Sequence, residues 1–408
     1  MNVDLSACTP TCRCVGPFRA VWVALGLGLF VFGMVYFAVT NTNPTSIITL
    51  KQRLIFTSPI LRDYWTIGNQ SVERFPIGDG FVAARIGDKA IIWGGVQVQP
   101  GGSLYLLPSD VVYSFMPDNQ FGLWKAMEAT GTIHPGTFFN GFAVLDSKIF
   151  IFGGHNGQNL TNALSTLDSN GHFDRLYPKG LIPSPRSVNQ GFAYNGKFFS
   201  IGGHLTQIKS RKIESRKEDY IENKIYPGYF YTNEFVEYDP KSNAFTQLFI
   251  QGAHLSPRIA FALAVLGDRV FIHGGLTLRG TRYANLNDFY VLDMKSFKLT
   301  ELKETGYLKG IDYHVAISLS KRHILFVGGF LSTGNSSEVT NQVKIFDAKK
   351  RQWKDEEPLS SEIGTGLVMH RATSFPGKKS FSILCLGGYS DYSWTLSSYM
   401  VLFNITLN

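Results

Sequence analysis

The sequence predicts an all-β protein built from six repeated β-sheet units, preceded by one apolar helix. A short apolar run ending in a Gly-Gly pair occurs six times, at intervals of 49 to 72 residues. Such a recurrence means that one supersecondary element is repeated along the chain. The 41 glycines and 14% aromatic residues suit many strands joined by tight turns. After the apolar helix, no segment shows a convincing helical period. The six runs are residues 91–95, 149–154, 198–203, 270–275, 324–329 and 383–388.

The N-terminal helix is predicted for residues 20–39, which are almost wholly apolar and carry no charge. Twenty such residues are long enough to cross a bilayer. A cleaved signal peptide is the alternative, but its apolar core spans only about 7–15 residues and ends at a site of small residues. We therefore expect a retained transmembrane signal anchor, with a tail at 1–19, a tether at 40–59 and the repeat domain at 60–408.

The flanking charges predict how this anchor is oriented. Arg13 and Arg19 lie close to its N-terminal end, whereas Lys51 and Arg53 are the first cations on the other side. Positive charge collects on the cytoplasmic side. We therefore expect a single-pass type II protein whose repeats are lumenal or extracellular. Small residues at 20, 24 and 28 would let two anchors approach closely and form a weak homodimer.

Two kinds of covalent modification have candidate sites. Cysteines beside a membrane-spanning helix suit S-palmitoylation, with unmodified thiols as the alternative. Asn-x-Ser/Thr sequons permit N-glycosylation if the repeats are lumenal. The palmitoylation candidates are Cys8, Cys12 and Cys14, and the glycosylation candidates are Asn69, Asn159, Asn335 and Asn404. No cofactor and no metal site is predicted.

Each repeat is expected to form four strands. In the fourth repeat they fall at 257–265, 270–273, 288–293 and 297–302, and Gly267-Asp268 suits the hairpin turn between the first two. Two further marks recur. An aromatic residue followed by an acid ends some third strands, and a tryptophan stands in some fourth strands. They are Tyr238-Asp239, Phe346-Asp347, Trp124 and Trp353.

Together with the Gly pairs, these marks make the chain resemble the kelch repeat over roughly residues 60–408. The resemblance implies a β-propeller, in which four-stranded blades surround a central channel. Propellers of this family commonly serve as interaction platforms. Some similar propellers outside the cytoplasm act on sugars.

The spacing also predicts how the ring closes. Residues 397–408 follow the sixth Gly pair and suffice for only a third strand. An N-terminal strand must then supply the fourth and leave no open edge. Trp65 precedes Gly94 by 29 residues, as Trp124 precedes Gly153. We therefore expect residues 63–67 to complete the last of six blades.

The predicted binding surface is the face that carries the long segments after the Gly pairs, which we call the long-loop face. Long loops on a rigid scaffold often carry recognition. The longest insertion has a mixed-charge stretch at 209–219, followed by Tyr226, Tyr229, Phe230 and Tyr231. These residues would suit an acidic or carbohydrate partner. In the alternative, which we favour, the aromatic side chains fold back onto the blade. The long segments are 96–109, 204–232, 276–287, 330–341 and 357–364.

Polar residues at the starts of the first strands are the ligand-binding candidates on this face. A ring of arginine and histidine side chains would clamp an anionic group. In the alternative, they hydrogen-bond neighbouring loops and close the rim. His155 and His204 each follow a Gly pair, but no third ligand with matching spacing makes them a metal site. The candidates are Asp79, His134, Arg186, Arg258, Asp312 and His314.

The favoured function is a membrane-tethered recognition module that binds a protein or a glycan. No catalytic constellation stands out. One alternative is a carbohydrate-acting enzyme, similar to a sugar isomerase or mutarotase, on the same propeller. Another is a kelch adaptor facing the cytosol. The formal charge of +8 is spread over the repeats, so nucleic-acid binding is not favoured.

Overall fold

The computed structural model divides the chain into two units, Met1–Val35 and Tyr36–Asn408, and every described residue belongs to the second. All elements in the described residues are β-strands, and none of these residues forms a helix long and apolar enough to cross a membrane. The predicted anchor lies outside them apart from Tyr36–Phe37, which form β1. The described ranges are 36–37, 48–55, 64–67, 70–73, 78–98, 104–117, 123–206, 219–224, 226–303, 310–332, 337–355, 367–377, 380–389 and 400–407.

Six sheets, numbered 1 to 6 along the chain, carry the six Gly pairs, and their main strands pair antiparallel. In sheets 2, 3 and 4 a further two-residue strand pairs in parallel with the fourth strand. Each has four main strands, named in order from first to fourth. Sheet 1 contains β5 (Val82–Ile86), β6 (Lys89–Trp93), β9 (Val111–Met116) and β10 (Leu123–Glu128). Sheet 2 contains β12 (Gly141–Leu145), β13 (Lys148–Phe152), β14 (Leu164–Leu167) and β15 (His172–Leu176). Sheet 3 contains β18 (Gln190–Tyr194), β19 (Lys197–Ile201), β23 (Phe235–Asp239) and β24 (Ala244–Leu248).

The second half of the chain repeats this order. Sheet 4 contains β26 (Ala262–Leu266), β27 (Arg269–His273), β30 (Phe289–Asp293) and β31 (Lys298–Glu301). Sheet 5 contains β33 (Val315–Ser318), β34 (His323–Val327), β37 (Val343–Asp347) and β38 (Gln352–Asp355). Sheet 6 contains β39 (Arg371–Pro376), β40 (Ser380–Leu386), β41 (Met400–Leu407) and β2 (Ile48–Ile55). The four strands expected in the fourth repeat are present, but the first of them begins at Ala262 and not at residue 257. The fourth-strand positions of Trp124 and Trp353 are confirmed.

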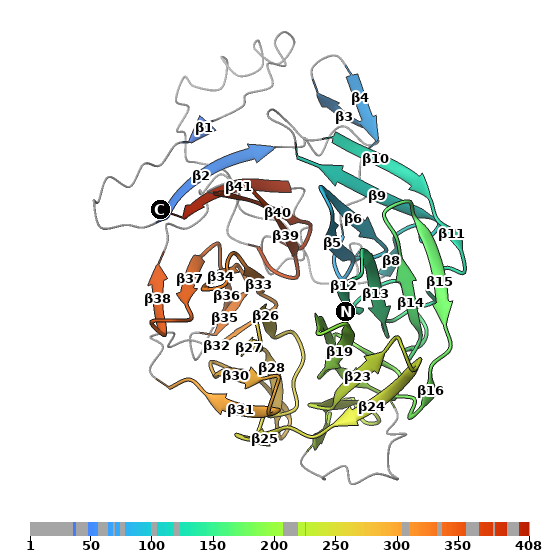
Figure 1. Cartoon of the computed structure of the whole chain (residues 1–408), viewed down its shortest axis with the longest axis vertical. Coiled ribbons are helices and arrows are strands. Elements are labelled where there is room, and N and C mark those ends of the chain that lie inside the picture. The colour runs from blue at the N-terminus through green and yellow to red at the C-terminus, as the bar shows by residue number, and fades with distance from the viewer. Residues whose placement is uncertain are drawn as a thin grey trace, which may run out of the picture. The chain divides into compact units, whose positions relative to one another are not determined.

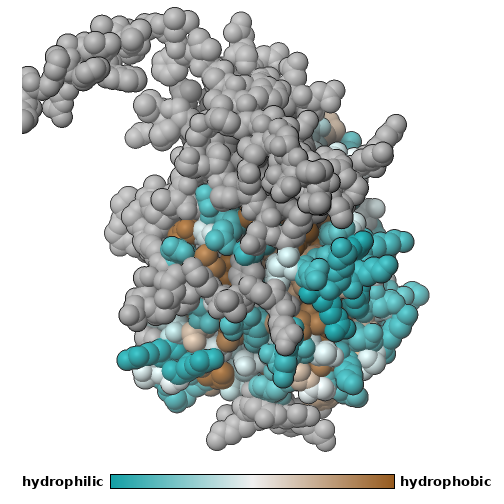
Figure 2. Space-filling model, turned by 90° about the vertical axis from the view of Figure 1, so that its left-hand side faces the viewer, coloured by the Kyte–Doolittle hydropathy of each residue, from teal (hydrophilic) through white to brown (hydrophobic). Residues whose placement is uncertain are grey.

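The core lies between neighbouring sheets. The second strands are buried along most of their length, since both of their faces are covered. For example, Phe375 and Leu384 of sheet 6 pack in one cluster with Phe115 and Trp124 of sheet 1. The described surface in Figure 2 is mainly hydrophilic, with small apolar areas between the polar side chains.

The first strands follow one another around a common centre (Figure 1). Each contacts the first strand of the next sheet, in the order β5, β12, β18, β26, β33 and β39, and β39 contacts β5 again.

The Gly pairs form the joints between sheets. In each pair the second N–H donates to a backbone carbonyl in the segment that precedes the first strand of the next sheet. A Cβ on the first glycine would lie only 2.1–3.0 Å from that same oxygen. Glycine is required there because the two backbones approach too closely for a side chain. The donor–acceptor pairs are Gly95–Thr137, Gly154–Arg186, Gly203–Arg258, Gly275–Ile311, Gly329–Leu367 and Gly388–Gly78.

The outer strand of sheet 6 corrects one prediction. An N-terminal strand does pair with β41, but it is β2, from residues assigned to the tether. The segment around Trp65 instead forms β3 (Tyr64–Ile67), which pairs with β4 (Gln70–Glu73) in a separate hairpin. All eight residues of β2 pair with the eight of β41. The short segment 63–67 could not match that length.

The segments after the Gly pairs were expected to be loops, but most of them contain strands. β7 (Val96–Val98) pairs with β8 (Leu104–Leu106), and β28 (Leu276–Arg279) with β29 (Arg282–Asn285). The longest insertion, at 204–232, contains β20 (His204–Leu205), β21 (Tyr220–Glu222) and β22 (Phe230–Thr232). After the fifth Gly pair, β35 (Phe330–Ser332) pairs with β32 (Gly310–Asp312) and β36 (Ser337–Val339) in a separate three-stranded sheet. Backbone pairing makes these segments a firm base for side chains on the long-loop face.

Candidate functional site

A ring of left-handed residues lies at the centre of the long-loop face. In the segment that leads into each first strand, one residue has a positive φ, between 51° and 65°. Four backbone hydrogen bonds of 2.7–3.3 Å link neighbours in this ring, Phe139 to Gly80, Val188 to Phe139, Tyr313 to Ala260 and Met369 to Tyr313. Left-handed backbone is costly for residues other than glycine and persists where the surroundings fix it. The ring members are Gly80, Phe139, Val188, Ala260, Tyr313 and Met369.

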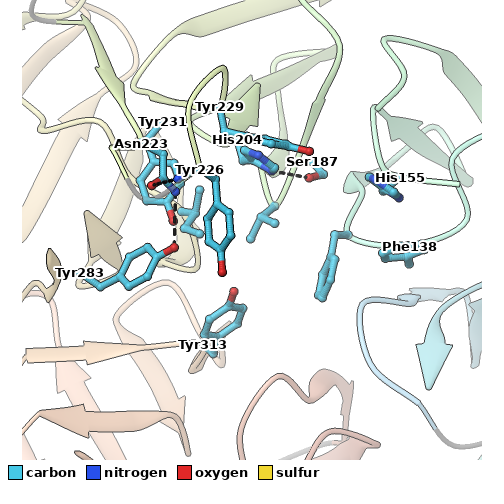
Figure 3. A pocket seen from close by; sticks show the side chains of 13 residues that line it. Phe138, His155, Ser187, His204, Asn223, Tyr226, Tyr229, Tyr231, Tyr283 and Tyr313 are labelled. Atoms are coloured by element: carbon cyan, nitrogen blue, oxygen red, sulfur yellow. Dashed lines mark hydrogen bonds between the residues drawn. The ribbon is translucent and has the colours of Figure 1, made fainter. Parts of the chain in front are cut away.

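Beside this ring lies a pocket of about 420 Å³, which we call the tyrosine pocket. It is lined by segments of sheets 2, 3 and 4 and by the ring itself. Figure 3 shows the hydroxyl groups of Tyr226, Tyr283 and Tyr313 pointing toward the same part of the pocket. Its other aromatic lining residues are Phe138, Phe139, His155, His204, Tyr229 and Tyr231.

The pocket has a buried floor and an exposed rim. Phe138 and Tyr231 are each 4% exposed, whereas Tyr226 is 59% and Tyr283 45% exposed. The aromatic residues of the longest insertion thus divide between the two expectations, which are contact with a partner and packing onto the blade. Tyr231 packs back onto the blade, while Tyr226 projects into solvent at the rim.

Local contacts hold the lining side chains. His204 stacks on Tyr229 with ring centroids 4.9 Å apart. The Asn223 Nδ2 donates to the Tyr283 hydroxyl at 3.4 Å, and the Asn223 Oδ1 accepts from the Tyr226 N–H at 3.1 Å. One amide therefore joins the rim tyrosines of sheets 3 and 4.

The described lining residues include no aspartate, glutamate, lysine or arginine. Burial lowers the pKa of His204 to about 4, with a further contribution from His155. Burial also lowers the pKa of His155 and raises the pKa of both Tyr231 and Tyr313. At neutral pH His155 and His204 are therefore uncharged, and Tyr231 and Tyr313 keep their hydroxyl protons.

Two buried ion pairs hold the hairpins that carry the rim. In sheet 3, Glu234 accepts from the Arg186 guanidinium and from the Tyr220 hydroxyl. Since Tyr220 begins β21, this cluster fixes the insertion to the sheet. In sheet 4, Arg258 makes two hydrogen bonds of 2.6 and 2.7 Å to Asp288, just beyond the β28–β29 hairpin. Bidentate pairs of this kind impose a definite geometry.

The repeat domain matches a known family model over most of its length. That model, described as the KLHDC2/KLHL20/DRC7 Kelch-repeats domain, matches residues 56–275 and 219–388. The chain belongs to the kelch-repeat family.

Kelch domain-containing protein 2 of Bos taurus is 27% identical over 262 residues, which cover 62% of this chain and 63% of that protein. Kelch domain-containing protein 1 of Homo sapiens is 25% identical over 227 residues, covering 53% and 54%. The chain thus spans less than two thirds of these relatives. The solved structure of YjhT, at 15% identity, superposes with a TM-score of 0.57 over 80% of this chain and 95% of that one. This similarity supports the kelch-like propeller fold.

The six predicted ligand-binding residues do not line the tyrosine pocket. All are at most 4% exposed. Three of them make the same kind of contact, because each donates to the carbonyl of the first glycine in the Gly pair of its own sheet. His134 donates to Gly153, Arg186 to Gly202 and Arg258 to Gly274. These contacts agree with the alternative, in which the polar side chains hydrogen-bond neighbouring loops and close the rim.

The other three candidates also contact the protein. Asp312 accepts from Asn285 at 2.9 Å, and His314 lies 2.9 Å from His273 between ring nitrogens. Asp79 pairs through its backbone with Val96. Burial raises the pKa of Asp79 to about 7 and that of Asp312 to about 8. Anion binding by this set stays a prediction.

The candidates lie in segments that also line this pocket, but their neighbours in the sequence supply the lining side chains. Ser187, Ile259 and Tyr313 each directly follow a candidate and line the pocket. Their orientation depends on the left-handed backbone, which the residue types do not predict. The tyrosines of the segments 204–232 and 276–287 are the signal that the sequence offers for this pocket.

The remaining candidates have mixed locations. Asn159 is exposed, and Asn404 lies in β41. Asn69, Asn335 and the three N-terminal cysteines lie outside the described residues. Within the described part of the chain, no three His, Cys, Asp or Glu side chains cluster as a metal site would require.

Proposed function

We propose that this kelch protein is a closed, six-bladed recognition module that binds a partner protein through its long-loop face. Kelch proteins generally bind protein partners. The cyclic contacts of the first strands and the Gly388–Gly78 joint support closure with six blades. The tyrosine pocket carries the functional proposal, because it combines an exposed aromatic rim with a rigid base. Tyrosines of this kind supply much of the binding energy at protein interfaces.

The module would be held at a membrane by residues 20–39, with residues 1–19 in the cytoplasm. The uncharged twenty-residue segment and the flanking arginines support this topology. The same proposal includes glycans at the four sequons, acyl chains at Cys8, Cys12 and Cys14, and pairing of two anchors. A glycosidase-induced gel shift, abolished by Asn159→Gln if that exposed sequon is used, would support the lumenal arrangement. Complete absence of glycans combined with protease access from the cytosol would support the cytosol-facing adaptor.

Site-specific photo-crosslinking tests the recognition proposal. A photoreactive residue in place of Tyr283 should form covalent adducts with the partner in cells. The matched control carries it in place of Tyr177, which is 74% exposed and contacts the β23–β24 turn through its backbone. Equal adducts from both positions, or adducts from position 177 alone, would contradict recognition through the pocket.

The carbohydrate-acting enzyme is the second candidate. Such chemistry needs an arginine, a histidine and a glutamate in one pocket. Arg186 and Glu234 lie together but are bonded to each other, with side chains 0% and 2% exposed. This arrangement favours a structural role for the pair. Turnover of a sugar that is lost on mutation of the tyrosine pocket would favour the enzyme instead.

A further inference from the structure

We infer that the tyrosine pocket binds an uncharged, proline-rich segment of the partner in the polyproline II conformation. This inference rests on the proposed recognition function and adds the chemistry of the bound segment. Three features of the pocket carry it. They are the absence of ionised groups from its described lining, its supply of hydrogen-bond donors, and its aromatic rim.

Charge complementarity favours a neutral ligand. No described lining residue is acidic or basic, and both lining histidines have lowered pKa values. An anionic ligand would therefore find no cation to pair with among these residues. A cationic ligand would find no carboxylate and would enter a chain of formal charge +8. Burying either charge without a partner is unfavourable.

The available polar groups favour a ligand that accepts hydrogen bonds. Tyr226, Tyr283 and Tyr313 present hydroxyl groups to the pocket (Figure 3). A polyproline II segment offers solvated carbonyl acceptors, and its prolines have no N–H to satisfy. A sugar presents several hydroxyl groups, each of which both donates and accepts, whereas a run of prolines adds no donor that the pocket must satisfy. The single amide at the rim, Asn223, already bonds to Tyr226 and Tyr283.

The shape of the rim agrees with this chemistry. Proline-rich segments dock in aromatic-lined grooves and lose little conformational entropy because their backbone is already extended. Tyr226 and Tyr283 stand exposed on hairpins of neighbouring sheets, and Tyr229 is fixed by stacking on His204. Proline rings can pack between such tyrosine side chains while the hydroxyls reach the peptide carbonyls.

The test is a binding screen of the purified full-length chain against an array of neutral ten-residue peptides. One set contains Pro-x-x-Pro patterns, and a matched set has alanine in place of each proline. A neutral glycan array is the parallel arm. We expect binding to members of the proline set that weakens at least tenfold in Tyr226→Ala and Tyr283→Ala. Tyr226→Phe, which keeps the ring, should weaken it only a few-fold. Tyr105→Ala is the control, since Tyr105 is 54% exposed outside the pocket.

The outcomes separate this inference from the proposed function. Pocket-dependent binding of the alanine set, or of charged partner segments in place of neutral ones, would overturn the proline inference and leave protein recognition standing. Pocket-dependent binding of glycans alone would overturn both. If no proline peptide binds while photo-crosslinking at position 283 still captures a protein, only the proline inference fails.

Discussion

The Gly388 N–H donates to the Gly78 carbonyl oxygen at 3.0 Å and thereby joins the last sheet to the first. Five equivalent bonds join the other sheets in chain order. Each joint also places the first glycine of the pair against the acceptor carbonyl. The feature that reveals the repeat in the sequence is therefore the contact that links one repeat to the next.

Substitution of a joint glycine should destabilise the protein far more than substitution of a turn glycine. Gly274 and Gly267 lie in the same sheet and have nearly equal φ values of +62° and +59°. A Cβ at Gly274 would lie 2.4 Å from the Ile311 oxygen, whereas nothing lies within 4 Å of one at Gly267. Both alanine variants bear the left-handed backbone cost of about 1–2 kcal/mol. We expect Gly274→Ala to lower the unfolding temperature several-fold more than Gly267→Ala, and equal shifts would contradict the joint.

Loss of Arg258 should destabilise sheet 4, because Asp288 would lose its buried partner. The Arg258 side chain is 0% exposed and also donates to the Gly274 carbonyl at 2.9 Å. Breaking a buried pair typically costs about 3–5 kcal/mol. We expect Arg258→Leu to reduce the free energy of unfolding by about that amount in a denaturant titration. Lys295→Ala, which removes the exposed ion pair to Asp268, is the control and should change little.

Asp312 should make the protein less stable as the pH rises. Burial raises its pKa from 3.8 to about 8, so the folded state holds its proton more tightly than the unfolded chain. The stability from this group is complete below about pH 4 and is lost as the pH rises through about 8. Asp312→Asn should therefore flatten the fall in unfolding temperature between about pH 4 and 8. An unchanged slope would mean that Asp312 is ionised in the folded protein.

The strand β2 can be tested by cross-linking. Lys51 and Asn404 are backbone partners in the β2–β41 pair. Antiparallel partners bring their Cα atoms to about 4.5–5.5 Å, within disulfide range. Oxidation of the Lys51→Cys/Asn404→Cys variant should give a disulfide detectable by mass spectrometry. Trp65→Cys/Asn404→Cys should give none, and the reverse result would restore residues 63–67 as the closing strand.

The strands could be predicted from the sequence because each apolar run ends at a glycine pair and short turn dipeptides separate its strands. Asn195 and Gly196, for instance, both adopt the positive φ that such a turn needs. The prediction that residues 63–67 close the ring is wrong, because the spacing of Trp65 matches that of Trp124 by coincidence. β2 pairs with β41 over eight residues, and the spacing of tryptophans does not show which segment can pair over that length.

The tyrosine pocket was less predictable than the strands. Buried polar residues such as Arg186 attract attention in a sequence, yet their side chains bond to the backbone and to Glu234. The exposed tyrosines come from hairpins of two different sheets. Their convergence depends on how neighbouring sheets are placed, which no local pattern encodes.

Hydrogen exchange of the full-length chain, with and without the partner captured at position 283, tests recognition through the long-loop face most directly. We expect partner-induced protection in residues 220–232 and 276–285, which carry the rim. The turns at 87–88, 146–147, 195–196 and 267–268 should exchange at unchanged rates. Protection of those turns without protection of the rim hairpins would contradict the account.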